Sequence, residues 1–331
     1  MKHHHLFTAT LLLWAASTLY AQGPNNSGTY YRAADGQRGA QLKTALCSII
    51  YNRQERKYNN LWTDFRSTDM RDDGKVWDMY SAVSNYTFGT DQAGSYNKEG
   101  DVYNREHSFP KSWFGGSVLP MYTDLNHLYP TDGFVNSKRS NFPFGETAGE
   151  SYKSAKNFSK LGSCTYPGYS STVFEPADEY KGDFARTYFY MVTCYEEKLA
   201  DWYRNNSDAR PTLDGKAYPG LSSWQLSMLL KWSANDPVSD KEVNRNKAVY
   251  NIQRNRNPFI DYPGLERLIW GDCQSLPFSY DHFEESLGIP SVAASPSLAK
   301  GTYDLQGRRL SDSQPLRRGL YVRNGKKLFV Q

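Results

Sequence analysis

The chain has 331 residues, of which 39% are hydrophobic and 15% are aromatic. This composition excludes an intrinsically disordered protein, and the length allows one large domain with an appendage, or two domains. The formal net charge of +4 at pH 7 suits a polyanionic partner without requiring one.

The N-terminus has the pattern of a secretory signal. Lys2 precedes an apolar run over residues 6–19, which is too short for a typical transmembrane helix. The small side chain of Ala21 suits cleavage before Gln22, so residues 1–21 are predicted to be a signal peptide. No other segment is apolar enough to cross a bilayer, and we expect an exported protein without a membrane span.

One globular domain of mixed helices and strands is expected over residues 22–288, after a mobile lead-in over 22–36 that is rich in Gly, Asn and Ser. Apolar residues at helical spacing predict helices over 39–51, 182–202, 222–233, 240–253 and 265–270. Strand-like patterns cover 76–81, 102–109 and 122–129, and the last two end at Pro110 and Pro130.

The composition changes near residue 288. Residues 289–300 are rich in Ser, Ala and Pro and are predicted to be a linker. Residues 301–331 contain short alternating stretches with Gly-containing turns, which predicts a small all-β module.

The four cysteines, Cys47, Cys164, Cys194 and Cys273, are widely spaced. Export permits disulfides, and four cysteines allow two bridges in three connectivities. Free, buried thiols are the alternative. The spacing has no CxxC pattern, which argues against a zinc site.

The most informative stretch is Tyr-Asn-Arg-Glu-His-Ser-Phe-Pro-Lys-Ser-Trp-Phe-Gly at residues 103–115. Three of the six histidines lie in the predicted signal peptide, which leaves His107, His127 and His282 for imidazole chemistry. Asp132 is a good N-cap for a helix through Lys138, so this window is expected to fold as strand, loop, strand, helix.

Side chains in this window suit metal-assisted hydrolysis of a phosphodiester. The carboxylate of Glu106 and the amide oxygen of Asn136 would hold Mg²⁺, with Mn²⁺ or Ca²⁺ as alternatives. A neutral His107 is a suitable general base for water, and Lys138 or Arg139 could contact the scissile phosphate. Each residue alone is explained as well by a structural role, such as a surface amide or a basic last helical turn.

A second basic run lies toward the C-terminal end of the domain. It could follow a nucleic-acid backbone, although solvated charges on a helix explain it equally well. Its members are Lys241, Arg245, Lys247, Arg254 and Arg256.

Three ordered blocks resemble the bacterial endonuclease I family: residues 104–115, Asp-Leu-Asn-His-Leu-Tyr-Pro at 124–130, and Val-Asn-Ser-Lys-Arg-Ser-Asn-Phe at 135–142. Asn-Arg-Asn-Pro-Phe-Ile-Asp at 255–261 resembles a further element of that family. The likeness runs from about Tyr30 to Trp270.

The resemblance implies a ββα-metal site with His107 as the general base. Glu106 and Asn136 would be the protein ligands of a single magnesium ion, and Arg139 is our own choice for phosphate contact. Family members often have Asp-x-His-Asn or Asp-x-His-His where this chain has Asp-Leu-Asn-His, so the roles of Asn126 and His127 stay open.

The C-terminal module resembles the sorting tails of proteins exported by the type IX secretion system. Tyr-Asp-Leu-Gln-Gly-Arg-Arg at 303–309 and Gly-Leu-Tyr-Val at 319–322 carry this likeness. It agrees with the predicted signal peptide and implies a secretion machinery as a partner.

We therefore expect an exported, magnesium-dependent, monomeric nuclease of the α+β class, with a mostly helical catalytic domain, a ββα-metal finger and an all-β tail. Its substrate would be DNA, with RNA as a second candidate, and contacts to the phosphate backbone would give little sequence preference. Two rivals are a non-catalytic nucleic-acid-binding protein of the same fold and an exported carbohydrate-binding protein, which the 25 Tyr and 8 Trp suggest.

Overall fold

The computed structural model describes residues 22–287, 302–303, 309–310, 319–323 and 326–330. Internal contacts divide the chain into two units, of which the first ends at Phe283 and the second begins at Glu284. The predicted signal peptide and the linker over 289–300 lie outside the described residues. Within the described part, no helix has both the length and the apolar character needed to cross a bilayer.

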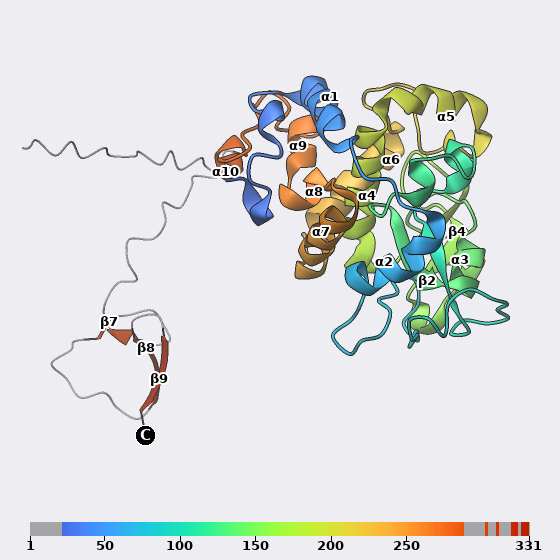
Figure 1. Ribbon diagram of the computed structural model, residues 1–331, viewed down its shortest axis with the longest axis horizontal. Helices are drawn as coiled ribbons and strands as arrows, with labels where there is room; N and C mark the ends of the chain where they lie inside the picture. Colours follow the sequence, from blue (N-terminus) through green and yellow to red (C-terminus); the bar gives the residue numbers. More distant parts are fainter. Residues whose placement is uncertain (1–21, 288–301, 304–308, 311–318, 324–325, 331) are drawn as a thin grey trace, which may run out of the picture. The chain divides into compact units, whose positions relative to one another are not determined.

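The helix α4, Lys181–Cys194, forms the centre of the first unit (Figure 1). It packs against α1 (Gly39–Ile50), α6 (Ser223–Asn235) and α8 (Pro258–Asp261). From Gly182 onward every residue of α4 is buried. A helix that is covered on all sides is a core helix rather than an amphipathic surface helix.

Other helices of the first unit lie around this centre. α2 (Leu61–Thr68) packs against α7 (Asp240–Gln253), and α9 (Leu265–Ile269) packs against α1. α7 begins with a capping box, because Ser239 and Glu242 each accept a hydrogen bond from the other's backbone N–H. α5 spans Leu199–Asn205, and α10 spans Phe283–Ser286 at the boundary between the two units. Short 3₁₀ turns lie at Pro24–Asn26, Arg32–Ala34, Tyr58–Asn60, Lys111–Phe114, Met121–Thr123, Ala155–Asn157, Asp178–Tyr180, Glu196–Lys198 and Ser207–Ala209.

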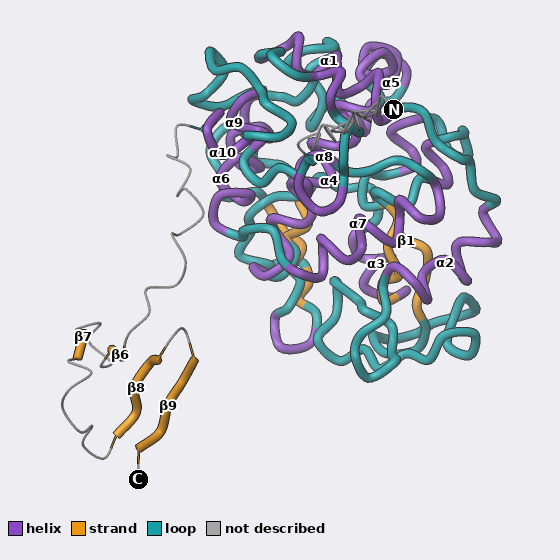
Figure 2. Tube along the Cα trace, turned by 60° about the vertical axis from the view of Figure 1, so that its left-hand side comes forward, coloured by secondary structure: helices purple, strands orange, loops and turns teal. Residues whose placement is uncertain are grey.

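Two strands and a helix form the part that contains most of the predicted site. β1 (Tyr103–His107) pairs antiparallel with β2 (Leu128–Asp132). α3 (Gly133–Arg139) follows β2 directly and contacts both strands, and Figure 2 shows it beside β1. α3 begins there because the Asp132 carboxylate accepts a hydrogen bond from the backbone N–H of Val135 at 2.9 Å. A separate antiparallel sheet contains β3 (Tyr152–Lys153), β4 (Lys160–Ser163) and β5 (Thr172–Glu175).

The second unit contains four described strands in the order β7-β6-β8-β9. They are β6 (Thr302–Tyr303), β7 (Arg309–Leu310), β8 (Gly319–Arg323) and β9 (Lys326–Val330), and they pair antiparallel. Residues 304–308 and 311–318 lie outside the described part. The all-β tail and its sorting role stay predictions.

The mixed helical and strand character of the first unit confirms the predicted α+β class. The helices expected over 39–51, 222–233 and 240–253 form nearly within those limits. The helix expected over 182–202 is instead split, because Tyr195 leaves the helical conformation at φ −117°, ψ 31°.

Three other expectations were wrong. Residues 76–81 form only an isolated bridge at Val76, and the Asp78 carboxylate accepts a hydrogen bond from the Tyr80 N–H, which is local bonding that competes with a sheet. The strand expected over 122–129 begins at Leu128 and continues through Pro130. The lead-in is packed rather than mobile, since Tyr31 is buried and donates a hydrogen bond to Asp261.

Candidate functional site

A cavity of about 430 Å³ lies beside β1. The predicted base, both predicted ligands and one of the two candidates for phosphate contact line it: Glu106, His107, Asn136 and Arg139. Lys138, the other candidate for phosphate contact, is not part of this lining. Glu106 and His107 are neighbours on a strand, and neighbours normally face opposite sides. At the end of β1, next to Pro110, both nevertheless reach the same cavity.

Glu106 is a buried carboxylate with several donors around it. Its Oε1 atom accepts hydrogen bonds from the Tyr80 hydroxyl at 2.9 Å and from Arg139 Nη1 at 3.1 Å, and the Asn136 side chain also hydrogen bonds to it. Burial raises the pKa of Glu106 to about 6, although these three partners favour the ionised form. A bound cation would favour ionisation further.

Arg139 is the buried ion-pair partner of Glu106 and is only 1% exposed. Its Nη1 atom also donates to the carbonyl of His107 at 3.2 Å, and Nη2 donates to the carbonyl of Ser108 at 2.6 Å. The guanidinium thus connects the last turn of α3 to the end of β1. The contact between Arg139 and a phosphate stays a prediction.

His107 is held in one orientation and one tautomer. Its Nε2 atom lies 3.0 Å from the carbonyl oxygen of Tyr122, which can only accept, so Nε2 carries the hydrogen and Nδ1 carries the lone pair. The ring stacks on Tyr122 with centroids 5.2 Å apart. Burial, with the nearby charges of His127, Lys111 and Arg105, holds the pKa of His107 well below its usual range. The ring is therefore neutral near pH 7.

The donors in the cavity suit a hard cation that keeps much of its water. Glu106 carries a carboxylate, and the half-buried Asn136, whose amide hydrogen bonds to it, also carries an amide oxygen. Among the residues that the structure describes, no group of three or more His, Cys, Asp or Glu side chains could enclose a metal. One carboxylate and one amide leave room for waters and a phosphate, which is the arrangement that Mg²⁺ favours.

The residues whose roles the sequence left open lie outside this cavity. His127 is buried, and its Nε2 atom donates to the carbonyl of Met121 at 2.7 Å. The Asn126 amide donates to Asn255. The Asp124 carboxylate is the centre of this buried network and accepts hydrogen bonds from Arg53, Tyr190, Tyr195 and Gln253.

One wall of the cavity could hardly be predicted from the sequence. The guanidinium carbon of Arg105 lies 3.6 Å from the centre of the Tyr58 ring and 4.3 Å from that of Trp62. Tyr58 in turn stacks on Tyr122 at 4.2 Å. Of these residues, only Arg105 lies in the window of residues 103–115. Its partners Tyr58 and Trp62 come from a turn and a helix far away in the chain.

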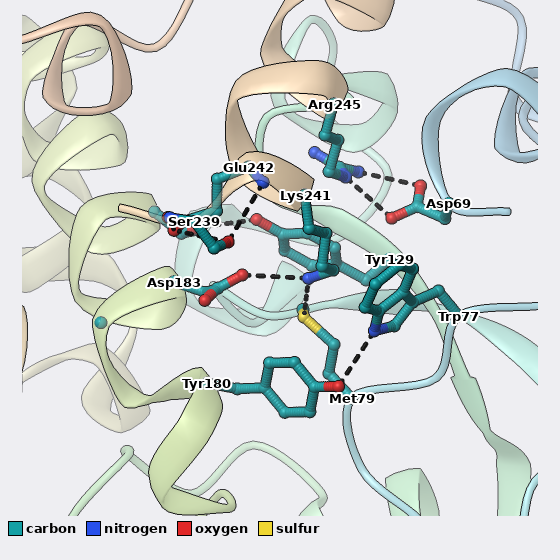
Figure 3. A network of polar contacts seen from close by, with 12 residues as sticks. Asp69, Trp77, Met79, Tyr129, Tyr180, Asp183, Ser239, Lys241, Glu242 and Arg245 are labelled. Atoms are coloured by element: carbon teal, nitrogen blue, oxygen red, sulfur yellow. Dashed lines mark hydrogen bonds and ion pairs between the residues drawn. The ribbon is translucent and has the colours of Figure 1, made fainter. Parts of the chain in front are cut away.

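Three of the five cations in the second basic run pair with buried carboxylates and do not form a surface for nucleic acid. Lys241 contacts Asp183 at 2.9 Å and Arg245 contacts Asp69 at 2.8 Å, and Figure 3 shows both pairs within one polar network. Arg256 pairs with Asp261 at 2.6 Å. These cations neutralise buried carboxylates, so neither a backbone track nor solvated helix charges describe them.

All four cysteines lie in the described part of the chain, and each is an unbridged, buried thiol. Burial raises the pKa of Cys47 to about 11 and that of Cys194 to about 12. Both thiols are therefore protonated near neutral pH.

Residues 38–264 match the family described as Endonuclease I. The chain is 36% identical over 249 residues to an extracellular ribonuclease of Bacillus amyloliquefaciens, a match that covers 73% of this chain and 78% of the relative. A second extracellular ribonuclease, from Bacillus subtilis (strain 168), is 36% identical over 74% of this chain and 79% of its own length. An extracellular deoxyribonuclease of Aeromonas hydrophila is 26% identical over 43% of this chain and 50% of its own length.

Proposed function

The chain belongs to the endonuclease I family, and from this premise we propose that it is a secreted, magnesium-dependent nuclease that cleaves DNA and RNA with little sequence preference. The observation that carries the proposal is the cavity in which Glu106, His107 and Asn136 meet. The predicted signal peptide and the names of the extracellular relatives support secretion.

His107 is the proposed general base. Its Nδ1 atom takes a proton from a water molecule as the water oxygen attacks phosphorus. The Tyr122 carbonyl, which accepts from Nε2 at 3.0 Å, holds the ring and stabilises the positive charge that the ring gains. The bond from phosphorus to the 3′ oxygen breaks, and this oxygen takes a proton from solvent. The products carry 5′-phosphate and 3′-hydroxyl ends.

Glu106 and Asn136 would hold the magnesium ion. Arg139 keeps Glu106 anionic despite its burial, because the guanidinium lies 3.1 Å from the carboxylate. A bound ion at this place would polarise the phosphoryl group and stabilise negative charge on the leaving oxygen.

The names of the relatives point to both kinds of substrate. Those aligned over about three quarters of the chain are named ribonucleases, and a relative aligned over less than half is named a deoxyribonuclease. Attack by water does not need the 2′-hydroxyl of the substrate. We therefore propose that this site accepts both DNA and RNA, and that RNA also yields 3′-hydroxyl ends rather than cyclic phosphates.

The test is cleavage of labelled DNA and RNA by the secreted protein with Mg²⁺ and with EDTA, followed by analysis of the product ends. Glu106→Ala should lose most cleavage and show weaker Mg²⁺ binding by calorimetry. Glu55→Ala, which removes an exposed carboxylate elsewhere, is the matched control and should behave as the parent.

Each alternative predicts a different result. Cleavage that persists in EDTA would contradict the metal dependence. Binding of nucleic acid without cleavage would indicate a non-catalytic member of the family. Binding of a polysaccharide in the presence of chelator, without any binding of nucleic acid, would favour the carbohydrate-binding alternative.

A further inference from the structure

We infer that Arg105, assisted by Lys111, binds the phosphate backbone of the substrate beside Glu106 and His107. The inference rests on the proposed function and adds to it the residues that hold the substrate. Both side chains line the cavity of the candidate site. Neither was among the residues that the sequence indicated for phosphate contact.

The position of Arg105 is fixed by aromatic stacking. Its guanidinium carbon lies 3.6 Å from the centre of the Tyr58 ring and 4.3 Å from that of Trp62, and Nη1 donates to the Tyr58 carbonyl at 2.8 Å. These contacts hold the group at the cavity that Arg105 lines. A guanidinium held in place can bind a phosphate with two parallel hydrogen bonds from one N–H edge.

The same stack connects Arg105 to the proposed base. Tyr58 stacks on Tyr122 at 4.2 Å, and Tyr122 stacks on His107 at 5.2 Å. Arg105 and His107 lie two residues apart on β1, and both line the same cavity. A phosphate bound by Arg105 is consequently held in the cavity that the imidazole lines.

Arg105 and Lys111 differ from Arg139, the third cation that lines the cavity, in their lack of a carboxylate partner among the described residues. Among the described residues that line it, Arg139 pairs with Glu106, the lining carboxylate. Arg105 and Lys111 have no ion pair with a carboxylate in the described part of the chain. Arg105 is half-exposed and Lys111 is exposed, so both can meet an incoming polyanion.

The test measures the salt dependence of binding. Fluorescence anisotropy with a labelled DNA duplex, in the His107→Ala background to prevent cleavage, gives log Kd between about 50 and 200 mM salt. Arg105→Gln and Lys111→Gln should each weaken binding and reduce the slope against log salt by about 0.9, the value for one phosphate contact. The double variant should reduce it by about twice as much.

Arg66→Gln is the matched control, because Arg66 is exposed, packs on the Phe88 ring and lies outside the cavity lining. Its slope should equal that of the parent. Arg105→Lys keeps the charge but not the two-donor edge, so it should keep the slope and still raise Kd. Lys111 is exposed, and Lys111→Gln therefore tests the inference even if Arg105→Gln fails to fold.

The outcomes separate this inference from the proposed function. Slopes for Arg105→Gln and Lys111→Gln that match that of Arg66→Gln, in a protein that cleaves nucleic acid with Mg²⁺, would overturn the inference alone. A parent protein that neither binds nor cleaves nucleic acid would overturn the proposed function as well.

Discussion

Burial acts on the two adjacent residues Glu106 and His107 with opposite chemical consequences. It raises the pKa of Glu106 to about 6 and holds the pKa of His107 well below its usual range, so both neutral forms are favoured. For His107, the proposed general base, the neutral form is the one that can accept a proton. For Glu106 the ionised form is needed to bind a cation, and the ion pair with Arg139 favours that form.

His107→Ala should lower kcat by a factor on the order of 10²–10⁴, the usual share of general acid–base catalysis. Mg²⁺ affinity should change little, because Glu106 and Asn136 are the proposed ligands. Nucleic-acid binding should also persist, since the residues proposed to contact phosphate are Arg105 and Lys111. Single-turnover cleavage, calorimetry with Mg²⁺ and anisotropy measure the three quantities separately.

His282→Ala is the control for this prediction. It removes an imidazole that is exposed and lies outside the cavity lining, and the variant should cleave at the parental rate. Loss of Mg²⁺ binding in His107→Ala would make His107 a ligand. A parental rate in His107→Ala would exclude it as the base.

The strand β1 and the helix α3 are held together by one guanidinium. Arg139 in the last turn of α3 reaches the carbonyls of His107 and Ser108 as well as Glu106. These contacts fix the two elements that supply the proposed ligands Glu106 and Asn136. Arg139 can therefore affect activity through the position of the ligands, without contact to the substrate.

Arg139→Met should lower the free energy of unfolding by about 3–5 kcal/mol, because it leaves the buried Glu106 without its ion-pair partner. Urea denaturation measures this change. Lys138→Met is the matched control, since Lys138 is half-exposed on the same helix and packs on the Phe134 ring; it should change the stability by less than about 1 kcal/mol.

The salt slope of DNA binding distinguishes the two roles of Arg139. A stable Arg139→Met variant with a slope reduced by about 0.9 would favour the phosphate contact that the sequence suggested. A destabilised variant with the parental slope would favour the structural role.

Elements with a strong local signal could be predicted from the sequence. α7 has helical periodicity and a capping box at Ser239, and both signals are local. The strands β3 to β5 are two to four residues long, too short for a reliable alternation pattern. α4 ends before the predicted limit, and the Tyr195 that follows it donates its hydroxyl to Asp124, a contact that only the folded chain forms.

The same reason limits what the sequence could indicate about the site. Glu106, His107, Asn136 and Arg139 lie within one continuous window and could be grouped from their chemistry. Tyr58 and Trp62 reach the cavity from a turn and a helix that precede that window by about forty residues. Nothing local marks them as partners of Arg105, because stacking depends on how α2 packs beside β1.

At the scale of the whole first unit, Asp124 connects segments that are far apart in the chain. Its carboxylate accepts hydrogen bonds from Arg53 after α1, from Tyr190 within α4, from Tyr195 after α4 and from Gln253 at the end of α7. It stands in the motif whose role the sequence left open. The contacts indicate that Asp124 stabilises the fold by joining these segments.

The stability of the first unit should therefore depend on the ionisation of Asp124. Burial alone would raise the pKa of Asp124, but Arg53, His127, Gln253 and Tyr190 outweigh it and lower the pKa to about 2. An unfolded aspartate titrates near about 3.9. Because the folded pKa is the lower one, the stabilisation is present above about pH 4 and is lost as the pH falls toward about 2.

Asp124→Asn should remove this contribution, which is roughly 2–3 kcal/mol for a shift of this size, and should also weaken the hydrogen bonds to the carboxylate. Urea unfolding of the parent and the variant between about pH 7 and pH 3 should show a large difference in stability at neutral pH that shrinks below about pH 4. Asp72→Asn, at an exposed position, should show no such difference. If the gap between the parent and Asp124→Asn stayed constant across this range, the stabilisation would come from packing and neutral hydrogen bonds, and the charge on Asp124 would not be what joins α1, α4 and α7.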